Sequence, residues 1–261
     1  MFIDGQMKRA LSIVSSGIIA IVILLCVFFR PYVEVWLSYV SQQVTGPKTV
    51  EQRLAQYGPA ARARIKPDFK RAGVSYPPKR LVLLGLKTER LLEVYAADEA
   101  NGFRCIRWYR IQAASGEVGP KLREGDRQVP EGIYTIESLN SNSRYHLALR
   151  VGYPNAFDKE QAKKDGRTFL GGDIMIHGNS LSVGCLAMGD EASEDLFVLA
   201  ADTGLQNITV VLSPVDFRTV KTFPFGPKIP AWANSVYQTI KEWLVQLPIP
   251  AILVQLPKKQ V

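Results

Sequence analysis

Short apolar runs separated by turn residues dominate residues 80–113 of this 261-residue chain. They read RLVLLGL, RLLEVYAA and FRCIRWYRIQA, with charged residues between the first two and an Asn-Gly pair before the third. Short runs that are bounded in this way are typical of β-strands. Similar runs follow later as GIYTIESL, RYHLALRV and NITVVLSP. The pattern predicts a fold that is mainly β.

Three segments have the residue spacing of helices that flank these strands. The run VEQRLAQYGPAARARI after Thr49 is interrupted by Gly58-Pro59 and predicts one or two short helices. Capping and acidic residues predict a helix that begins near Asp190, and PAWANSVYQTIKEWLVQL predicts another. The segment AFDKEQAKKDGRTFLGG is expected instead to be a polar excursion that forms a flexible lip over a site.

The segment ALSIVSSGIIAIVILLCVFF, residues 10–29, carries no charge and would span about 30 Å as a helix, enough to cross a bilayer. Lys8 and Arg9 precede it, which favours a cytoplasmic N-terminus and an exported remainder. A cleaved signal peptide is the alternative, but its apolar region is usually only about 7–15 residues long and ends in small residues. We therefore expect an uncleaved, single-pass transmembrane helix.

The overall composition is that of a globular protein, with 47% hydrophobic residues, 21% charged residues and a formal net charge of +8. A positive charge suits nucleic acid, an anionic membrane or a carboxylate-rich substrate. The basic residues are scattered, and the sequence has no zinc finger or RNA-binding signature. Nucleic acid is therefore not an expected partner.

The stretch IMIHGNSLSVGC, residues 174–185, holds one of the two histidines and one of the three cysteines of the chain. A strand that ends at His177 and a short turn to Cys185 can bring an imidazole and a thiol together. A cysteine attacks as its thiolate, so it requires a base, and His177 is the available one. Gly184 would let a substrate approach backbone N–H groups that form an oxyanion hole. A buried structural cysteine and a zinc site are the alternatives.

Other candidate groups are expected to be structural. Asp126 and Glu131 have the residue types of an acid–base pair, but we expect them to brace their long polar loop through hydrogen bonds. Cys105 is expected to be a half-buried strand residue. Because Cys26 lies inside the apolar segment, only Cys105 and Cys185 could form a disulfide in the exported part.

The block GGDIMIHGNSLSVGCLAM resembles the active-site motif of the L,D-transpeptidase catalytic (YkuD-type) domain family, in which His-Gly precedes Ser-x-Gly-Cys. Four more blocks resemble the same family in the same order: YPPKRLVLLGLKTERLLEVY, GPKLREGDRQVPEGIY, YHLALRVGYPN and ITVVLSPVDFR. The resemblance implies a β-sandwich-like catalytic domain with flanking α-helices. The expected layout is a cytoplasmic N-terminus at 1–9, the transmembrane anchor at 10–29, a juxtamembrane stalk and helical segment at 30–75, the catalytic domain at 76–218, and a C-terminal helix and apolar tail at 219–261.

The resemblance also implies a role for each residue of the motif. Cys185 would attack the carbonyl of an L-centre next to a D-centre in a peptidoglycan stem peptide and form a thioester, with His177 as the general base. The backbone carbonyl of Gly178 would orient the imidazole, and the N–H groups of Gly184 and Cys185 would bind the oxyanion. Ser182 would shape the turn. The Cys185 thiol is expected to be ionised near neutral pH.

Ser182, His146, Arg144 and Arg150 are candidates for substrate binding in the same interpretation. His146 lies in the strand before GYPN, and the two arginines flank it, where they could bind stem-peptide carboxylates. A structural histidine and solvated arginines are the alternatives. The resemblance implies neither a metal nor a cofactor.

Two features separate the chain from the commonest family pattern. Val183 stands where a second histidine would precede Gly-Cys, and the gap between His177 and Cys185 is shorter than in most members. Both features are similar to the YafK-like branch, which includes an enzyme that hydrolyses linkages between peptidoglycan and a lipoprotein. The expected function is acyl transfer on stem peptides, with a hydrolase or amidase at the same site as the alternative and a non-enzymatic wall-binding module as the second. The expected location is the inner membrane, with the catalytic domain in the periplasm and a wall-linked lipoprotein as a candidate partner.

Overall fold

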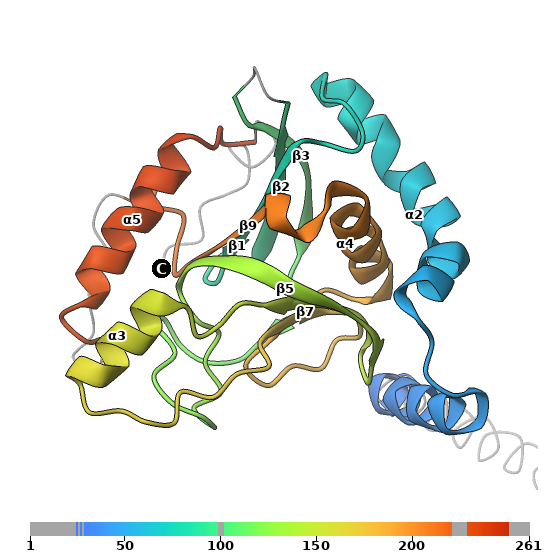
Figure 1. Ribbon diagram of the computed structural model, residues 1–261, viewed down its shortest axis with the longest axis horizontal. Coiled ribbons are helices and arrows are strands. Elements are labelled where there is room, and N and C mark those ends of the chain that lie inside the picture. The colour runs from blue at the N-terminus through green and yellow to red at the C-terminus, as the bar shows by residue number, and fades with distance from the viewer. Residues whose placement is uncertain (1–24, 26, 28, 99–101, 221–228, 251–261) are drawn as a thin grey trace, which may run out of the picture.

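The computed structural model describes residues 25, 27, 29–98, 102–220 and 229–250 (Figure 1). The strands are β1 (Arg80–Leu86), β2 (Leu91–Ala97), β3 (Arg104–Arg110), β4 (Ala113–Ala114), β5 (Gly132–Ser143), β6 (His146–Val151), β7 (Met175–His177), β8 (Leu186–Ala187) and β9 (Ile208–Ser213). The helices are α2 (Val50–Ala72), α3 (Ala156–Lys164), α4 (Asp190–Thr203) and α5 (Ala233–Val245), with a 3-10 turn η1 (Leu205–Asn207), and residues 29–45 are helical before α2. The prediction of a mainly β fold with flanking helices is confirmed.

The strands form one sheet in the order β3-β2-β1-β9-β5-β6-β7-β8-β4. The long strand β5 pairs with β9 through its first residues and with β6 through its later ones. This strand therefore joins two halves of the sheet, which face each other across a shared core. A Cβ added to Gly85 of β1 would lie 3.3 Å from the side chain of Leu186 in β8, so the two halves approach closely.

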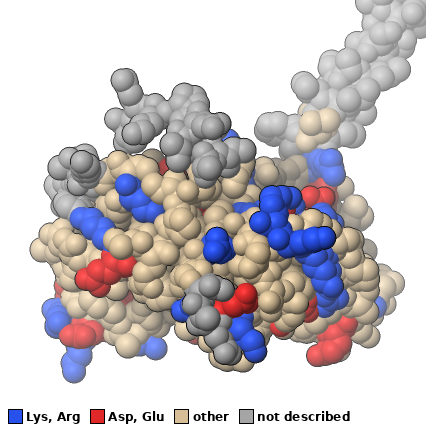
Figure 2. All heavy atoms as spheres, turned by 90° about the horizontal axis from the view of Figure 1, so that it is seen from above, with Lys and Arg blue, Asp and Glu red and all other residues tan. Residues whose placement is uncertain are grey.

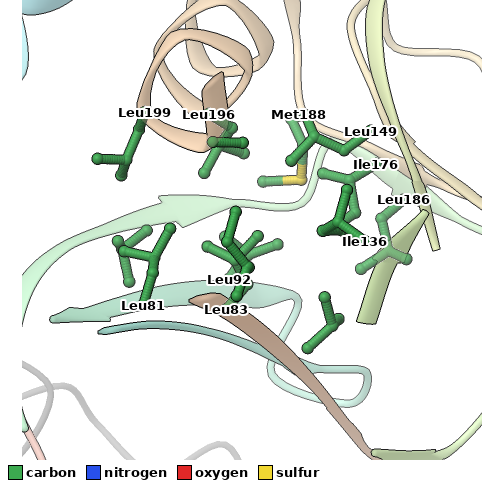
Figure 3. Packing of buried hydrophobic residues seen from close by; sticks show 14 of the residues in the cluster. Leu81, Leu83, Leu92, Ile136, Leu149, Ile176, Leu186, Met188, Leu196 and Leu199 are labelled. Atoms are coloured by element: carbon green, nitrogen blue, oxygen red, sulfur yellow. The ribbon is translucent and has the colours of Figure 1, made fainter. Parts of the chain in front are cut away.

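Aliphatic side chains from both halves of the sheet fill the space between them (Figure 3). Leu83 and Leu92 come from β1 and β2, whereas Ile176 and Leu186 come from β7 and β8, and all four are almost completely buried. Full burial of one such side chain contributes about 1.5–3 kcal/mol to stability. The opposite face of β1 packs against α5 in a second cluster, which includes Val82, Leu84, Tyr237 and Ile240.

Helix α2 is a single 23-residue helix that continues through Gly58-Pro59, although the sequence predicted an interruption there. Gly58 has no Cβ to clash with the proline ring, which removes part of the usual penalty before proline. Thr49 begins the helix with a capping box that includes Gln52. Packing of α2 against α4 then holds the helix along its length.

Lys and Arg side chains gather on the side of the molecule where α2 lies (Figure 2). Two of the arginines pair with acidic residues of α4, Arg62 with Asp202 at 2.6 Å and Arg64 with Glu194 at 3.0 Å. Partly exposed ion pairs contribute only about 0–1 kcal/mol each. The buried apolar residues of α2, including Ile65, therefore determine its position more than these charges do.

The expected irregular lip contains a helix. Residues 156–164 form α3, and Asn155 and Asp158 cap its first turn reciprocally. This start signal is present in the sequence, but the segment has too few apolar residues to show helical periodicity. The first half of the predicted polar excursion is therefore a helix, which the sequence analysis did not predict.

The predicted transmembrane anchor at 10–29 lies outside the described residues except for Leu25, Val27 and Phe29. In the part of the chain that the structure describes, none of the helices combines the length and the apolar character needed to cross a bilayer. The apolar C-terminal tail likewise lies outside the described residues beyond Pro250.

Candidate active site

His177 ends strand β7, and Cys185 directly precedes strand β8, the neighbour of β7 in the sheet. Strand β7 runs parallel to β8, with Ile176 opposite Leu186 and His177 opposite Ala187. Ile176 and Leu186 belong to the core. Because side chains alternate along a strand, His177 and Cys185 both lie on the opposite face. The fold thus brings the two predicted residues to one face of adjacent strands.

The surroundings of His177 select one form of its ring. The side chain is 2% exposed, and Nδ1 lies 2.6 Å from the Gly178 carbonyl oxygen. A carbonyl only accepts hydrogen bonds, so Nδ1 carries the proton and Nε2 keeps its lone pair. Burial lowers the pKa of His177, against the Gly178 hydrogen bond, which raises it. The imidazole is therefore neutral near pH 7 and has a basic nitrogen.

The Cys185 thiol makes its hydrogen bonds to the backbone. It donates to the Asp173 carbonyl at 3.5 Å and accepts from the Met175 N–H at 3.4 Å. Within the described residues, no hydrogen bond joins this thiol to His177. Burial raises the pKa of Cys185, against the Met175 N–H, which lowers it. This direction is opposite to the thiolate expected from the sequence, so a base must take the proton during attack.

Alkylation of Cys185 by iodoacetamide is expected to accelerate with pH through a midpoint above about 8.5, the value of a free cysteine. The reason is that burial favours the neutral thiol. Peptide mass spectrometry separates this site from Cys105, whose pKa burial raises to about 12, so Cys105 serves as a slower internal control. A midpoint below pH 7 at Cys185 would show a preformed thiolate and contradict the expectation.

The turn before Cys185 presents the two backbone N–H groups that the sequence predicted for an oxyanion hole. The Gly184 N–H donates to Ser115 Oγ at 2.5 Å, and the Cys185 N–H donates to Ser182 Oγ at 3.2 Å. Ser182 also donates to the Cys185 carbonyl at 2.6 Å and so closes the turn. Gly184 has a φ of +82°, a conformation that favours glycine. Serine hydroxyls therefore hold both N–H groups in this conformation.

The two acidic residues of the long loop act as braces, as predicted. Asp126 pairs with Lys121 at 2.6 Å and also accepts backbone N–H groups of its own loop. Glu131 is buried and accepts from Lys87 Nζ at 2.8 Å and from the Tyr237 hydroxyl at 2.6 Å. Neither carboxylate is arranged as half of an acid–base pair.

Of the four candidate substrate-binding residues, Ser182 lies in the turn before Cys185, and Arg150 lies on the face of Cys185. It stands opposite Met175 in the pairing of β6 with β7, and it contacts Asp173 at 2.8 Å and Glu137 at 3.4 Å. His146 instead contacts Glu194 at 3.1 Å and the edge of the Tyr57 ring, which links its hairpin to α4 and α2. Arg144 is exposed in the hairpin turn.

Tyr145 is a site residue that the sequence did not predict. Its ring stacks on the His177 imidazole, with the centroids 4.8 Å apart and an interplanar angle of 29°. The contact arises at the turn between β5 and β6, where His146 has a φ of +69° and the strand register shifts. The alternation of apolar and polar residues in RYHLALRV predicts a strand, but it does not predict this turn or the contact of Tyr145 with His177.

A disulfide and a metal site are two other roles that the sequence left open for the cysteines. Cys105 and Cys185 are both free thiols, so they do not form a disulfide. Across the described ranges, no three His, Cys, Asp or Glu side chains are grouped so that they could hold a metal ion. The arrangement around Cys185 is that of a thiol beside a neutral imidazole.

Comparisons with known proteins place this site in a family. Residues 79–212 match the model of the L,D-transpeptidase catalytic domain (YkuD). Proteins of Escherichia coli strains K12 and O157:H7, each named "Putative L,D-transpeptidase YafK", are 35% identical over 113 residues, which is 42% of this chain and 43% of each relative. The match therefore takes in less than half the length of these curated relatives.

Two solved structures are similar with lower scores. The helical cell shape determining protein Pgp2 from Campylobacter jejuni is 26% identical with a TM-score of 0.44, over 54% of this chain and 50% of that one. Bd1075 from Bdellovibrio bacteriovorus is 20% identical with a TM-score of 0.37, over 66% of this chain and 57% of that one. The match to the family model takes in more than half of the chain and contains both His177 and Cys185. The chain therefore belongs to the L,D-transpeptidase catalytic domain family.

Proposed function

We propose that this protein is an L,D-transpeptidase, an acyltransferase that modifies peptidoglycan stem peptides through a thioester on Cys185. The observation that carries the proposal is the placement of the thiol on the same face as His177, whose Nδ1 is fixed and whose Nε2 is available. Membership of the family supports stem peptides as the substrate class. The names of the YafK relatives agree with this reaction class.

In the acylation step, the imidazole acts as the general base. Nε2 of His177 takes the thiol proton while Sγ of Cys185 attacks the carbonyl carbon of the L-centre. The same proton then passes to the departing amine of the D-residue, and a thioester remains. The Gly178 carbonyl stabilises the imidazolium through Nδ1–H. Because the thiol bonds to Met175 and Asp173 and not to His177 in this conformation, its side chain must rotate when substrate binds.

The oxyanion that develops in this step requires donors beside the sulfur. The N–H groups of Gly184 and Cys185 are the candidates, and they now donate to the hydroxyls of Ser115 and Ser182. A substrate oxygen would replace a hydroxyl there. Loss of a single oxyanion donor typically lowers kcat about 10²–10³-fold, so this exchange is a large part of the proposed catalysis.

The product depends on which nucleophile attacks the thioester. The amine of a second stem peptide would give a crosslink, whereas water would give hydrolysis. Val183 replaces the usual second histidine, as in the YafK-like branch, and its side chain is exposed beside the nucleophile. A hydrolase or amidase that cleaves stem-peptide or lipoprotein linkages is therefore the alternative function.

Arg150 is the candidate for recognition of substrate carboxylates. It shares the face of Cys185, and its present partners, Asp173 and Glu137, have exposed side chains. Exposed pairs of this kind exchange at little cost in free energy. A stem-peptide carboxylate would then take the place of one of these acidic side chains.

The uncharged segment at 10–29, with Lys8 and Arg9 before it, supports an inner-membrane location with the catalytic domain in the periplasm. The wall polymer bears many carboxylates, which suits the net charge of +8. A wall-linked lipoprotein is a candidate partner under the hydrolase alternative.

Incubation with defined muropeptides tests the proposal. The substrates are tetrapeptide stems and stems that carry a lysine on the diamino acid, and mass spectrometry identifies the products. New dimers that require Cys185 would establish a transpeptidase, and release of lysine or of the terminal residue without dimers would establish a hydrolase. If no substrate changed, the enzymatic proposal would be replaced by a wall-binding module.

Replacing Tyr145 with alanine is expected to lower kcat/KM about 10–100-fold, because the ring that stacks on His177 fixes the general base. The matched variant Tyr145→Phe keeps the stack and should stay within about threefold of the wild type. The acid limb of the kcat/KM profile should also move to higher pH in Tyr145→Ala, since greater exposure raises the pKa of the imidazole. If the pH profile of kcat/KM were the same in Tyr145→Ala as in the wild type, Tyr145 would have only a structural role.

A further inference from the structure

The helix at residues 29–45 rests on the turn that follows the proposed base. Asn179 Nδ2 donates to the Pro31 carbonyl at 3.1 Å and to the Glu34 carboxylate at 3.3 Å. Asn179 itself is held in a left-handed conformation, with its N–H bound to Asp190 at 2.7 Å. Figure 1 shows the helix in blue at the edge of the body, near the end of β5. The segment before α2 is therefore fixed to the active site.

The two faces of this helix are inverted relative to a usual surface helix. Its half-buried positions include the polar residues Glu34, Ser38 and Gln42, together with Pro31, Val35 and Val40. Tyr32, Trp36 and Tyr39 are 57%, 62% and 51% exposed. With about 3.6 residues per turn, these three rings form one stripe on the side away from Glu34. A surface helix normally turns its apolar side toward the protein core. An aromatic stripe on the outer side therefore indicates contact with something other than water.

The sequence before this helix indicates which environment contacts the aromatic stripe. The stripe follows directly on the uncharged segment 10–29, which has the length of a membrane span. Tyr and Trp are the side chains that favour the boundary between lipid tails and headgroups, and here they recur at spacings of three and four residues. The helix has an apolar stripe on one side and polar contacts with the protein on the other, as an interfacial helix does.

We propose that the stripe formed by Tyr32, Trp36 and Tyr39 lies in the headgroup region of the lipid bilayer, and that the 29–45 helix thereby holds the catalytic face at the membrane surface. Asn179 joins this helix to the turn between His177 and Cys185. The depth of the helix in the bilayer therefore sets the distance between Cys185 and the membrane surface. The substrates within reach are then peptides of the wall layer next to the membrane. The proposal concerns location and is independent of the acyl-transfer chemistry.

Fluorescence quenching of the full-length protein in phosphatidylglycerol–phosphatidylcholine vesicles tests this proposal. Lipids that carry a nitroxide near the headgroup or deep in the acyl chain are the quenchers, and the difference between wild type and Trp36→Phe isolates Trp36. The shallow quencher should reduce the Trp36 signal at least twofold more than the deep quencher. Trp243→Phe is the control, because Trp243 belongs to α5 and should show no quenching by either lipid.

Three results would overturn the proposal. In the first, Trp36 is quenched by acrylamide in the water and by neither lipid, which places the stripe in solvent or against protein. In the second, the deep nitroxide quenches it more than the shallow one, which makes the segment part of a span. In the third, the protein does not float with the vesicles. None of these results affects a thioester at Cys185, so the two proposals fail separately.

Discussion

Replacing Cys185 with alanine is expected to lower kcat/KM for stem peptides by about 10⁴-fold or more, to the level at which no product is detected. Among the residues that the structure describes, Cys185 has the only thiol on this face, and binding alone cannot replace it. The measurement is the rate of product release from muropeptides by mass spectrometry. Cys105→Ala is the matched control, because that thiol is half-buried in β3 and its loss should leave the rate unchanged.

The partner variant His177→Gln should fall to a similar level, and the double variant should be little worse than either single one. Groups that act as a unit show this non-additivity. Additive losses would mean that His177 acts apart from the thiol. Full activity in Cys185→Ala would contradict the account, because the proposed reaction has no other nucleophile.

Replacing Glu131 with alanine is expected to lower the free energy of unfolding by about 3–5 kcal/mol. The carboxylate is buried and receives Lys87 Nζ at 2.8 Å, the Gly119 N–H at 2.9 Å and the Tyr237 hydroxyl at 2.6 Å. Its removal leaves the Lys87 ammonium in a buried site with only carbonyl partners. Urea unfolding of the full-length protein measures the effect.

The matched control is Glu137→Ala, because Glu137 contacts Arg150 at 3.4 Å on the exposed face and its loss should cost less than about 1 kcal/mol. The same brace also fixes the loop that holds the nucleophile turn, since Ser115 joins the Arg127 carbonyl to the Gly184 N–H. Glu131→Ala should therefore lower activity at temperatures where it remains folded. A loss of stability below about 1 kcal/mol would show that the loop is held by other contacts.

The elements that the sequence predicted well are those in which burial and local pattern agree. β1 and β2 are almost completely buried, and each pairs with a strand on both sides, so their mostly apolar runs were clear. The helix near Asp190 was predicted, and Asp190 and Glu191 stand in its first turn as expected, although its N-cap is Gly189 without a side-chain hydrogen bond. Prediction from local sequence failed where tertiary contacts determine the structure. Helix α2, for example, continues through Gly58-Pro59, and it packs against α4.

The candidate site divides in the same way. His177 and Cys185 lie in one stretch of sequence, and the resemblance of that stretch to the family motif singled them out as the candidate pair. The Tyr145 stack, the hydroxyl of Ser115 on Gly184 and the contact of Asn179 with the 29–45 helix join residues far apart in the chain. Hydrophobic periodicity along the sequence does not predict contacts between residues that are far apart in the chain. The ionisation of Cys185 also depends on burial, which the sequence does not state.

The mass of the intact protein during turnover tests the central claim most directly. Full-length wild type, mixed with a tetrapeptide stem and quenched in acid, should gain the mass of the acyl donor without its terminal residue. Digestion should place that mass on the peptide that contains Cys185, and hydroxylamine should remove it, as it does a thioester. Absence of the adduct while products form, or an adduct on a residue other than Cys185, would contradict the account.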